Sequence, residues 1–318
     1  MTLHSDPLIS IVIIAYNMAR EVPRTVETFL PPYQQGIESE EIEIIVMENG
    51  STEPIAPEVV ENWPANVRYI KVESPKPSPA NALNEGVKLS RGAWVCPVID
   101  GARMITPGVI KSCKDMMKVY DNPVIATIGY HLGPIIQQEN VNNGYNQQVE
   151  DELLASINWP HSPYKIFSIS CLGGSARALW LGKLPESNVL IMRKEFYLSI
   201  SGFDEAFNIP GGGLVNLDFF KRCVDHHDSQ YILLLGEGSF HQFHGGVTTS
   251  RSVSKPSLSK NNMSTWEEYA QQYAHIRGEN YKPSDKEPIL YGQANANVKR
   301  ETLTAAKHII NINTKKFK

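Results

Sequence analysis

The segment Ser78–Arg103, SPANALNEGVKLSRGAWVCPVIDGAR, decides the fold that we expect for this chain. Residues 80–90 have the pattern of a helix that ends before Gly92. The apolar run 93–99 is typical of a buried strand that delivers Asp100 to its carboxyl end. Ligands of open α/β sheets bind at the carboxyl ends of strands. Asp100 is therefore a candidate ligand of a cation or a sugar hydroxyl, and the alternative is a plain turn residue.

Other predicted strands end at the same edge of the sheet. Residues 8–15 are apolar at nearly every position, as expected of a central parallel strand. Residues 42–47 and 67–72 are further strand candidates, and a helical pattern at 23–29 follows the first strand. This alternation predicts a doubly wound α/β sheet whose strand ends converge on one pocket. The polar side chains that follow the first two strands are Tyr16, Asn17, Glu48 and Asn49.

Two common nucleotide motifs are missing from the sequence. No Gly-x-Gly-x-x-Gly follows the first predicted strand, which argues against a dinucleotide site of the Rossmann type. No P-loop pattern occurs either. The polar residues after the strands still offer what a mononucleotide needs for its base, ribose and phosphates.

The composition limits the partners and the compartment that we expect. A net charge of −4 and a pI of about 6.2 argue against a nucleic-acid partner bound by phosphate attraction. The four cysteines form no Cys-x-x-Cys pattern, which is typical of reduced thiols in a cytoplasmic protein. The chain opens without a signal-peptide pattern and has no apolar run of transmembrane length. Any membrane contact is therefore expected to be peripheral.

Three segments at the start of the chain resemble the family 2 glycosyltransferases, which have the GT-A fold. SIVIIAYN (10–17) is similar to the family's first strand, and IIVMENGST (44–52) is similar to its Val-Asp-Asp-Gly-Ser step. PANALNEGVKLSRGAWVCPVIDGA (79–102) is similar to its Ala-x-Asn-x-Gly helix before Asp-x-Asp. The resemblance implies a mixed GT-A sheet flanked by helices and a sugar transfer from a nucleotide-diphosphate sugar, with UDP as the expected nucleotide.

Three segments further along the chain extend the resemblance to about residue 250. Residues 187–207 resemble the family's segment that ends in Gly-Phe-Asp-Glu, and residues 211–223 lie where an acidic pair precedes Asp-Leu-x-x-Arg. FHQFHGG (240–246) matches a His that follows the last core strand. The residues to which the resemblance gives a role in nucleotide-sugar binding are Ala15, Tyr16, Asn17, Glu48, Asn49, Asn84, Asp100, Gly101, Arg103 and Arg251.

The expected metal site departs from the family pattern. The second acid of Asp-x-Asp is absent, because Asp100 is followed by Gly101, Ala102 and Arg103. Asp100 and His244 are still able to hold Mn²⁺ or Mg²⁺, since Mn²⁺ accepts imidazole as well as carboxylate. The alternatives are that Arg103 supplies the positive charge without a metal, or that it is a solvated surface side chain.

The spacing of His241 and His244 predicts that only one of them faces the site. Residues 231–235 are expected to form a strand and 236–239 a turn. In an extended segment, side chains three residues apart point to opposite faces. His244 is preferred, because the two glycines after it allow a close backbone approach.

The general base expected of an inverting enzyme is also missing. Alignment of Asp218 and Arg222 with Asp-Leu-x-x-Arg places Val215 and Asn216 at the acidic pair. An Asn side chain accepts no proton at neutral pH, so that the expected catalytic carboxylates are Asp218, Asp204 and Glu205. Residues 216–218 also resemble a motif of some retaining transferases. The chain is therefore expected to be an inverting transferase, a retaining one, or a catalytically silent subunit that binds a sugar nucleotide.

The expected domain organisation follows from these segments. Residues 1–250 would form the GT-A domain, with a nucleotide-sugar half (1–105) and an acceptor half (106–250). The Ser/Lys-rich residues 251–263 are expected to be a linker or lid. Residues 264–318 would be a helical extension that contacts the acceptor or a second copy of the chain. The expected acceptor is a hydroxyl of a glycan or a lipid-linked glycan in cell-surface polysaccharide or glycoconjugate synthesis.

Overall fold

The fold is built around one mixed sheet. The computed structural model describes residues 6–244 and 264–316, with side chains up to residue 312. The strand order is β10-β9-β6-β8-β4-β1-β2-β3, with β5 added beside β9 and β7 beside β6. The strands are β1 Ile9–Ala15, β2 Ile42–Glu48, β3 Val67–Lys71, β4 Trp94–Val98, β5 Arg103–Ile105, β6 Pro123–Leu132, β7 Ser170–Leu172, β8 Leu190–Arg193, β9 Gln230–His241 and β10 Ile289–Gly292.

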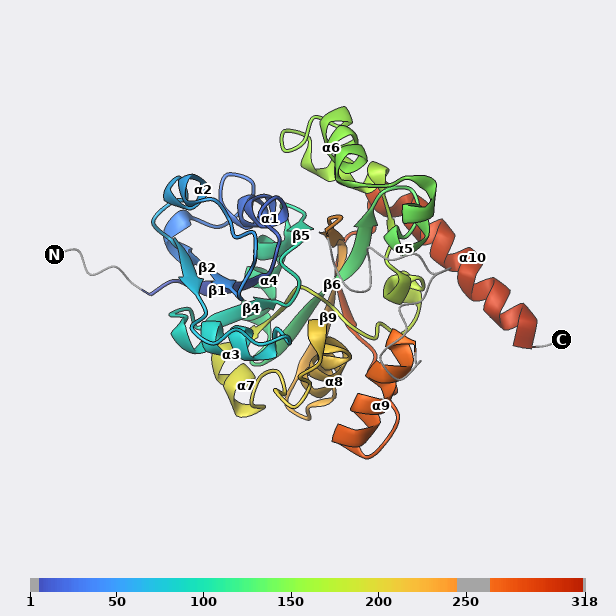
Figure 1. Ribbon diagram of the computed structural model, residues 1–318. Helices are drawn as coiled ribbons and strands as arrows, with labels where there is room; N and C mark the ends of the chain where they lie inside the picture. The colour runs from blue at the N-terminus through green and yellow to red at the C-terminus, as the bar shows by residue number, and fades with distance from the viewer. Residues whose placement is uncertain (1–5, 245–263, 317–318) are drawn as a thin grey trace.

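Helices cover both faces of this sheet. Figure 1 shows α1 and α2 on one side of the N-terminal strands, with α3 and α7 on the other. The helices are α1 Glu21–Phe29, α2 Pro57–Glu61, α3 Ala80–Leu89, α4 Val109–Val119, α5 Gln137–Asn140, α6 Gln147–Ser156, α7 Lys194–Ser199, α8 Val215–Asp225, α9 Thr265–Arg277 and α10 Lys299–Lys316. The expectation of an α/β sheet flanked by helices is confirmed.

The central strand β1 is buried on both faces, as its continuous apolar run predicts. Ile11 and Ile13 pack with α1 and α4 in one core, whereas Val12 and Ile14 pack with α3, α7 and α8 in the other. The helix α3 lies close against this strand, because a Cβ at Gly86 would lie only 2.4 Å from Val12 Cγ1. This approach fixes the helix that carries Asn84 against the sheet.

The sheet is parallel at its N-terminal side and mixed beyond β4. Strands β3, β2, β1 and β4 run in the same direction, whereas β8 runs antiparallel to β4 and β6. Parallel pairing between β6 and β9 resumes on the other side of β8. The carboxyl ends of β1, β2 and β4 therefore meet at one edge, where the sequence places Asn17, Asn49 and Asp100.

The expected turn at residues 236–239 is wrong. Strand β9 continues through this segment to His241, and Gly236 lies within it at φ +77°. The pairing of β6 with β9 shifts register at this point, which marks an irregularity in the strand. A glycine tolerates this backbone conformation at little cost, so that the strand bends and continues instead of ending.

The C-terminal segment adds to the sheet as well as to the helices. Strand β10 pairs in parallel with β9, and Ile289 lies opposite Ile232. Helix α9 is preceded by a capping box of Ser264 and Glu267, and Gly278 caps its C-terminal end. Helix α10 projects away from the body at the C-terminal end (Figure 1). Among the described residues, the structure contains no helix of the length and apolarity that crossing a membrane requires.

Candidate functional site

Three ligand-type side chains converge at the carboxyl end of β4. His241 Nε2 lies 3.0 Å from one oxygen of Asp100, and His244 Nε2 lies 3.5 Å from the other. The two imidazole Nε2 atoms are 3.1 Å apart. One ligand atom from each of the three side chains lies within 4.8 Å of the others, which is compatible with a single metal ion.

The orientation of His241 is set by a buried glutamine. The side-chain Nε2 of Gln137 donates to the carbonyl oxygen of His241 at 3.0 Å, which fixes the direction of its amide group. Gln137 Oε1 then accepts from Nδ1 of the His241 ring at 2.5 Å. The proton of a neutral His241 therefore lies on Nδ1, and the lone pair on Nε2 faces Asp100 and His244.

The protonation states of Asp100 and His241 also suit the binding of a cation. Burial disfavours the charged imidazole and lowers the pKa of His241 to about 4, although Asp100 acts in the opposite direction. Burial disfavours the charged form of Asp100 as well, but the positive charges of a protonated His241 and of Arg103 hold the pKa of this carboxyl well below its usual range. At neutral pH the site thus contains an ionised carboxylate beside a neutral imidazole.

Arg103 is part of this cluster and not a solvated surface side chain. It is 8% exposed, and its Nε donates to Asp100 Oδ2 at 3.1 Å. Strand β5 places it there, because Arg103 pairs with His241 across the two strands. One carboxylate oxygen of Asp100 is therefore shared with a guanidinium, while the other receives a backbone N–H from Ala102 at 3.2 Å.

The prediction that only one of the two histidines faces the site is wrong. Strand β9 ends at His241, and the three residues that follow it are not part of a strand, so that the alternation of side chains along a strand does not apply there.

The polar run 137–148 predicts a surface loop or the entry to a helix, yet Gln137 is fully buried. No sequence signal distinguishes it from the other polar residues of this run.

Glu48 and Asn49 differ in what they leave available at the end of β2. Both oxygens of Glu48 are engaged, one by the backbone N–H and hydroxyl of Ser51 and the other by the Tyr69 hydroxyl at 2.9 Å. Asn49 donates to the carbonyl oxygen of Lys76 at 2.9 Å, and its buried Oδ1 has no hydrogen-bond partner in the part of the chain that the structure describes. Asn49 is therefore the residue of this pair with an unpaired polar atom.

Asn17 and Asn84 hold loops in place beside the crevice. Asn17 lies at φ +52°, and its Oδ1 accepts from the Thr52 backbone N–H at 2.9 Å, which joins the ends of β1 and β2. Asn84 accepts from the Tyr197 hydroxyl at 2.6 Å and donates to the Phe203 carbonyl at 2.9 Å. These contacts give both asparagines a structural role in addition to any contact with a ligand.

The remaining expected binding residues differ in exposure. Tyr16 is 53% exposed at the end of β1, whereas Ala15 is buried and its carbonyl accepts from the Asn49 backbone N–H at 2.8 Å. Gly101 packs under the strand, since a Cβ there would lie 2.1 Å from the Ile14 carbonyl oxygen. Arg251 lies outside the described residues.

Asp218 is enclosed by arginines. Its side chain is 2% exposed and is bound by Arg222 Nε at 2.8 Å. Arg277 of α9 binds both carboxylate oxygens, at 2.6 and 2.7 Å. Two guanidinium groups thus occupy the oxygens of Asp218, and this arrangement favours a structural role over proton transfer.

Asp204 and Glu205 are also bound by neighbouring side chains. Asp204 forms an ion pair with Arg277 at 2.8 Å. Glu205 accepts from Asn81 at 3.0 Å and Asn84 at 3.2 Å, and pairs with Lys76 at 3.3 Å. Each of these carboxylates therefore joins two segments of the chain that are distant in sequence.

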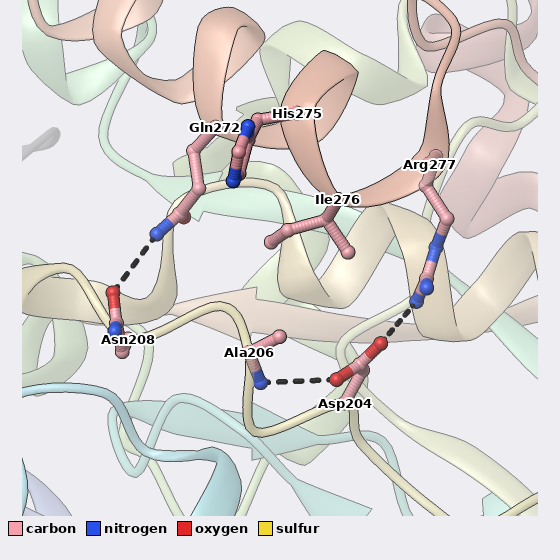
Figure 2. Close-up of a pocket in the computed structure, with 7 residues that line it drawn as sticks. All are labelled: Asp204, Ala206, Asn208, Gln272, His275, Ile276 and Arg277. Atoms are coloured by element: carbon pink, nitrogen blue, oxygen red, sulfur yellow. Dashed lines mark hydrogen bonds and ion pairs between the residues drawn. The ribbon is translucent and has the colours of Figure 1, made fainter.

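A polar hollow lies beside Asp204, between the loop 204–208 and helix α9 (Figure 2). Its volume is about 630 Å³. In Figure 2 the Gln272 side chain reaches across to Asn208 on one side, and Arg277 reaches Asp204 on the other. Among the described residues, the Oε1 of Gln272 has no hydrogen-bond partner, but this atom is buried and not exposed in the hollow.

Comparison with known families gives a match in the N-terminal part of the chain. Residues 10–148 match the model of glycosyl transferase family 2, which confirms the resemblance over these residues. This segment contains the ends of β1, β2 and β4, including Asp100, as well as the buried Gln137. No curated protein sequence matches the chain.

Comparison with solved structures supports the fold. The structure of S. aureus TarS 1–349 in complex with UDP-GlcNAc is similar to this chain with a TM-score of 0.50 and 14% identity, over 84% of this chain and 66% of that one. TarS 1–349 without a named ligand gives a TM-score of 0.46 at 15% identity, over 70% and 57% of the two chains. The chain thus spans less than two thirds of these proteins. The predicted GT-A type fold is confirmed.

Proposed function

We propose that this protein is a glycosyltransferase that transfers a sugar from a nucleotide-diphosphate sugar to a hydroxyl group. The observation that carries this proposal is the cluster of Asp100, His241 and His244 at the carboxyl end of β4. This strand end belongs to the segment that matches glycosyl transferase family 2. Ligands of open α/β sheets bind at this edge, so that a nucleotide diphosphate would lie beside the cluster.

The three ligands fit a divalent cation that accepts both oxygen and nitrogen. Two imidazoles and one carboxylate suit Mn²⁺ better than Mg²⁺, which prefers oxygen ligands. Asp100, His241 and His244 would hold the ion, and Arg103 would add a positive charge beside it. A cation bound there supplies Lewis-acid stabilisation of the negative charge that develops on the departing diphosphate.

The end of β2 offers an acceptor for a nucleobase, and we propose uracil as that base. The buried Oδ1 of Asn49 has no partner within residues 6–244 and 264–312, and it requires a hydrogen-bond donor. The N3–H group of uracil is such a donor, and so are the amino group of cytosine and the N1–H group of guanine. The structural relative TarS 1–349 was solved in complex with UDP-GlcNAc, which agrees with a UDP-linked donor. Tyr16, Asn17 and Glu48 would border the nucleoside, and Asn84 would support the loop beside the diphosphate.

The acceptor would approach from the side of α8 and α9. The polar hollow next to Asp204 is lined by groups that hydrogen-bond to sugar hydroxyls, among them Asn208 and His275. We propose a glycan or lipid-linked glycan as the acceptor, with a role in cell-surface polysaccharide or glycoconjugate synthesis. Contact with a membrane surface would then be peripheral.

Calorimetric titration of UDP, GDP and CMP tests the donor site. Each nucleotide is titrated with Mn²⁺, with Mg²⁺ and with EDTA, on the wild type and on Asp100→Ala. UDP binding that requires Mn²⁺ and Asp100 is the expected result. If EDTA leaves nucleotide binding unchanged, Arg103 and not a metal ion supplies the positive charge beside the diphosphate. If none of the nucleotides binds, the proposed function is contradicted.

A further inference from the structure

The structure places a glutamate beside the position at which this chain lacks the acid of the family pattern. Asn216 occupies the position at which the resemblance expects an acid, in the first turn of α8. Its side-chain Nδ2 donates to Glu186 Oε2 at 2.8 Å and lies 3.4 Å from Asn188 Oδ1. A glutamate from a distant part of the chain therefore reaches the side chain at position 216.

The strand register places Glu186 at the edge of the sheet that contains Asp100. Strand β8 runs antiparallel to β4, with Arg193 opposite Trp94 and Met192 opposite Val95. The residues that precede β8 consequently lie toward the carboxyl end of β4. This segment is anchored by Ser187, whose Oγ accepts from the Thr127 backbone N–H at 3.1 Å.

The start of α8 lies at the same edge. Gly211, shortly before this helix, donates its backbone N–H to the Pro77 carbonyl at 3.1 Å. Pro77 belongs to the loop that follows β3, next to the ends of β2 and β1. The pair of Glu186 and Asn216 is thus framed by the loops that surround the proposed nucleotide crevice.

Glu186 differs from the other carboxylates considered for proton transfer. Asp218, Asp204 and Glu205 each pair with a lysine or an arginine. Within residues 6–244 and 264–312, Glu186 forms no ion pair, and its side chain is only half-buried. A partly accessible carboxylate without a cationic partner is free to take up a proton, and Asn216 orients it through a single hydrogen bond.

We propose that Glu186 is the general base of the transfer reaction, in the place that an acid at position 216 would otherwise take. This proposal rests on the proposed glycosyltransferase function. The proton of the acceptor hydroxyl moves to the Glu186 carboxylate while the acceptor oxygen bonds to the anomeric carbon. The bond from that carbon to the phosphate oxygen breaks, and its electron pair leaves with the nucleoside diphosphate. Glu186 then releases the proton to solvent, and this single displacement inverts the anomeric centre.

The test exchanges the carboxylate and the amide group between positions 186 and 216. Glu186→Gln removes the base, and the double variant Glu186→Gln/Asn216→Asp restores a carboxylate at position 216. In this double variant the amide introduced at position 186 donates to the carboxylate introduced at position 216, so that the hydrogen bond between the two positions is kept. The matched control is Glu195→Gln, at an exposed glutamate on the adjacent helix α7.

Two readouts separate catalysis from donor binding. Turnover is measured as UDP release from UDP-GlcNAc, with water and with a set of methyl glycosides as acceptors. UDP affinity is measured by calorimetry with Mn²⁺ present. We expect Glu186→Gln to lower kcat by about 10²-fold or more at a UDP Kd within about threefold of the wild type. The kcat of the double variant should be at least about tenfold higher than that of Glu186→Gln. The product should have the inverted anomeric configuration.

Three outcomes would overturn the proposal. Turnover of Glu186→Gln equal to that of Glu195→Gln would exclude Glu186 as the base. Equal losses in Glu186→Gln and in the double variant would mean that the glutamate acts through packing and not through its charge. A wild type that binds UDP without turning over UDP-GlcNAc would contradict any base at this position. Failure of the wild type to bind a nucleotide would instead refute the proposed function itself.

Discussion

His241 Nε2 and His244 Nε2 lie 3.1 Å apart at the carboxyl end of β4, with an Asp100 oxygen 3.0 Å from the first of them. Gln137 keeps the proton of neutral His241 on Nδ1, so that Nε2 presents a lone pair to its neighbours. Three electron-rich atoms at this separation require a proton or a cation between them. The ability of Mn²⁺ to accept both atom types makes this cluster the central feature of the proposed donor site.

His241→Ala should weaken Mn²⁺ binding. The substitution removes one of the three ligands without removing the Asp100 carboxylate, and we expect a loss of at least about tenfold in Mn²⁺ affinity. The measurement is calorimetric titration of Mn²⁺ in the presence of UDP. The control is His161→Ala, at an exposed position that belongs to neither group of side chains able to hold a metal ion. Equal affinity in the two variants would exclude His241 as a ligand.

Gln137→Leu should weaken the same site without removing a ligand. The leucine cannot accept the Nδ1 proton of His241, so that the ring loses the contact that fixes its orientation and its protonated nitrogen. Partners of this kind contribute about 10- to 100-fold to metal affinity, and we expect a loss in this range. The matched control is Gln148→Leu, at an exposed position of α6. Circular dichroism checks that both variants are folded, and an unchanged Mn²⁺ Kd in Gln137→Leu would contradict the assigned orientation.

The parts of the fold that sequence predicts are those with a strong local pattern. The continuous apolar run of β1 and the helix signals of α3 appear within one residue of the expected limits. The apolar run before Asp100 predicts its place at the end of β4, and the structure has it two residues beyond Val98. These signals are local, because a strand that is buried on both faces has apolar residues at consecutive positions of the sequence.

The parts that sequence does not predict depend on contacts between distant segments. Gly236 bends β9 and allows it to continue to His241, whereas a glycine in sequence is equally typical of a turn. Gln137 reaches His241 over 104 residues, and Asn216 reaches Glu186 over 30. The sequence contains no periodic pattern that indicates which distant polar side chains contact each other. The full set of residues at the site is therefore known only from the structure.

The Glu150 carboxyl should make the stability of the protein depend on pH. Burial raises the pKa of Glu150 to about 7, although the Phe243 backbone N–H and Arg20 act in the opposite direction. The folded state therefore binds more protons than the unfolded state between pH 4.5 and about 7. Stability from this group is complete below pH 4.5 and is lost as the pH rises through about 7, with an upper limit of about 3 kcal/mol.

Glu150→Gln tests this dependence, because the amide still accepts from Phe243 but has no charge to lose. Urea unfolding at about pH 5 and about pH 8 gives the free energy of unfolding for the variant and the wild type. The fall in stability between these pH values should be smaller in the variant. The control is Glu152→Gln, at an exposed position of the same helix. An unchanged difference between the two pH values would show that the Glu150 pKa is not raised.

Arg277→Gln should destabilise the protein without abolishing UDP binding. Arg277 is 26% exposed and binds both oxygens of the buried Asp218, and it also pairs with Asp204, so that it ties α9 to two earlier segments. Its loss leaves Asp218 with Arg222 alone, which should lower the free energy of unfolding by about 1–3 kcal/mol. Urea unfolding measures this change, with Arg177→Gln as the control, since that arginine is half exposed and its pair with Glu139 spans 4.0 Å.

The companion variant Asp218→Asn separates structure from catalysis at the same place. If Asp218 holds α8 and α9 together, Asp218→Asn should unfold at lower urea concentration yet keep most of its turnover when assayed well below its unfolding transition. Glu186→Gln should show the reverse, with wild-type stability and little turnover. A loss of about 10²-fold in kcat for Asp218→Asn at unchanged UDP affinity would instead return the role of general base to Asp218.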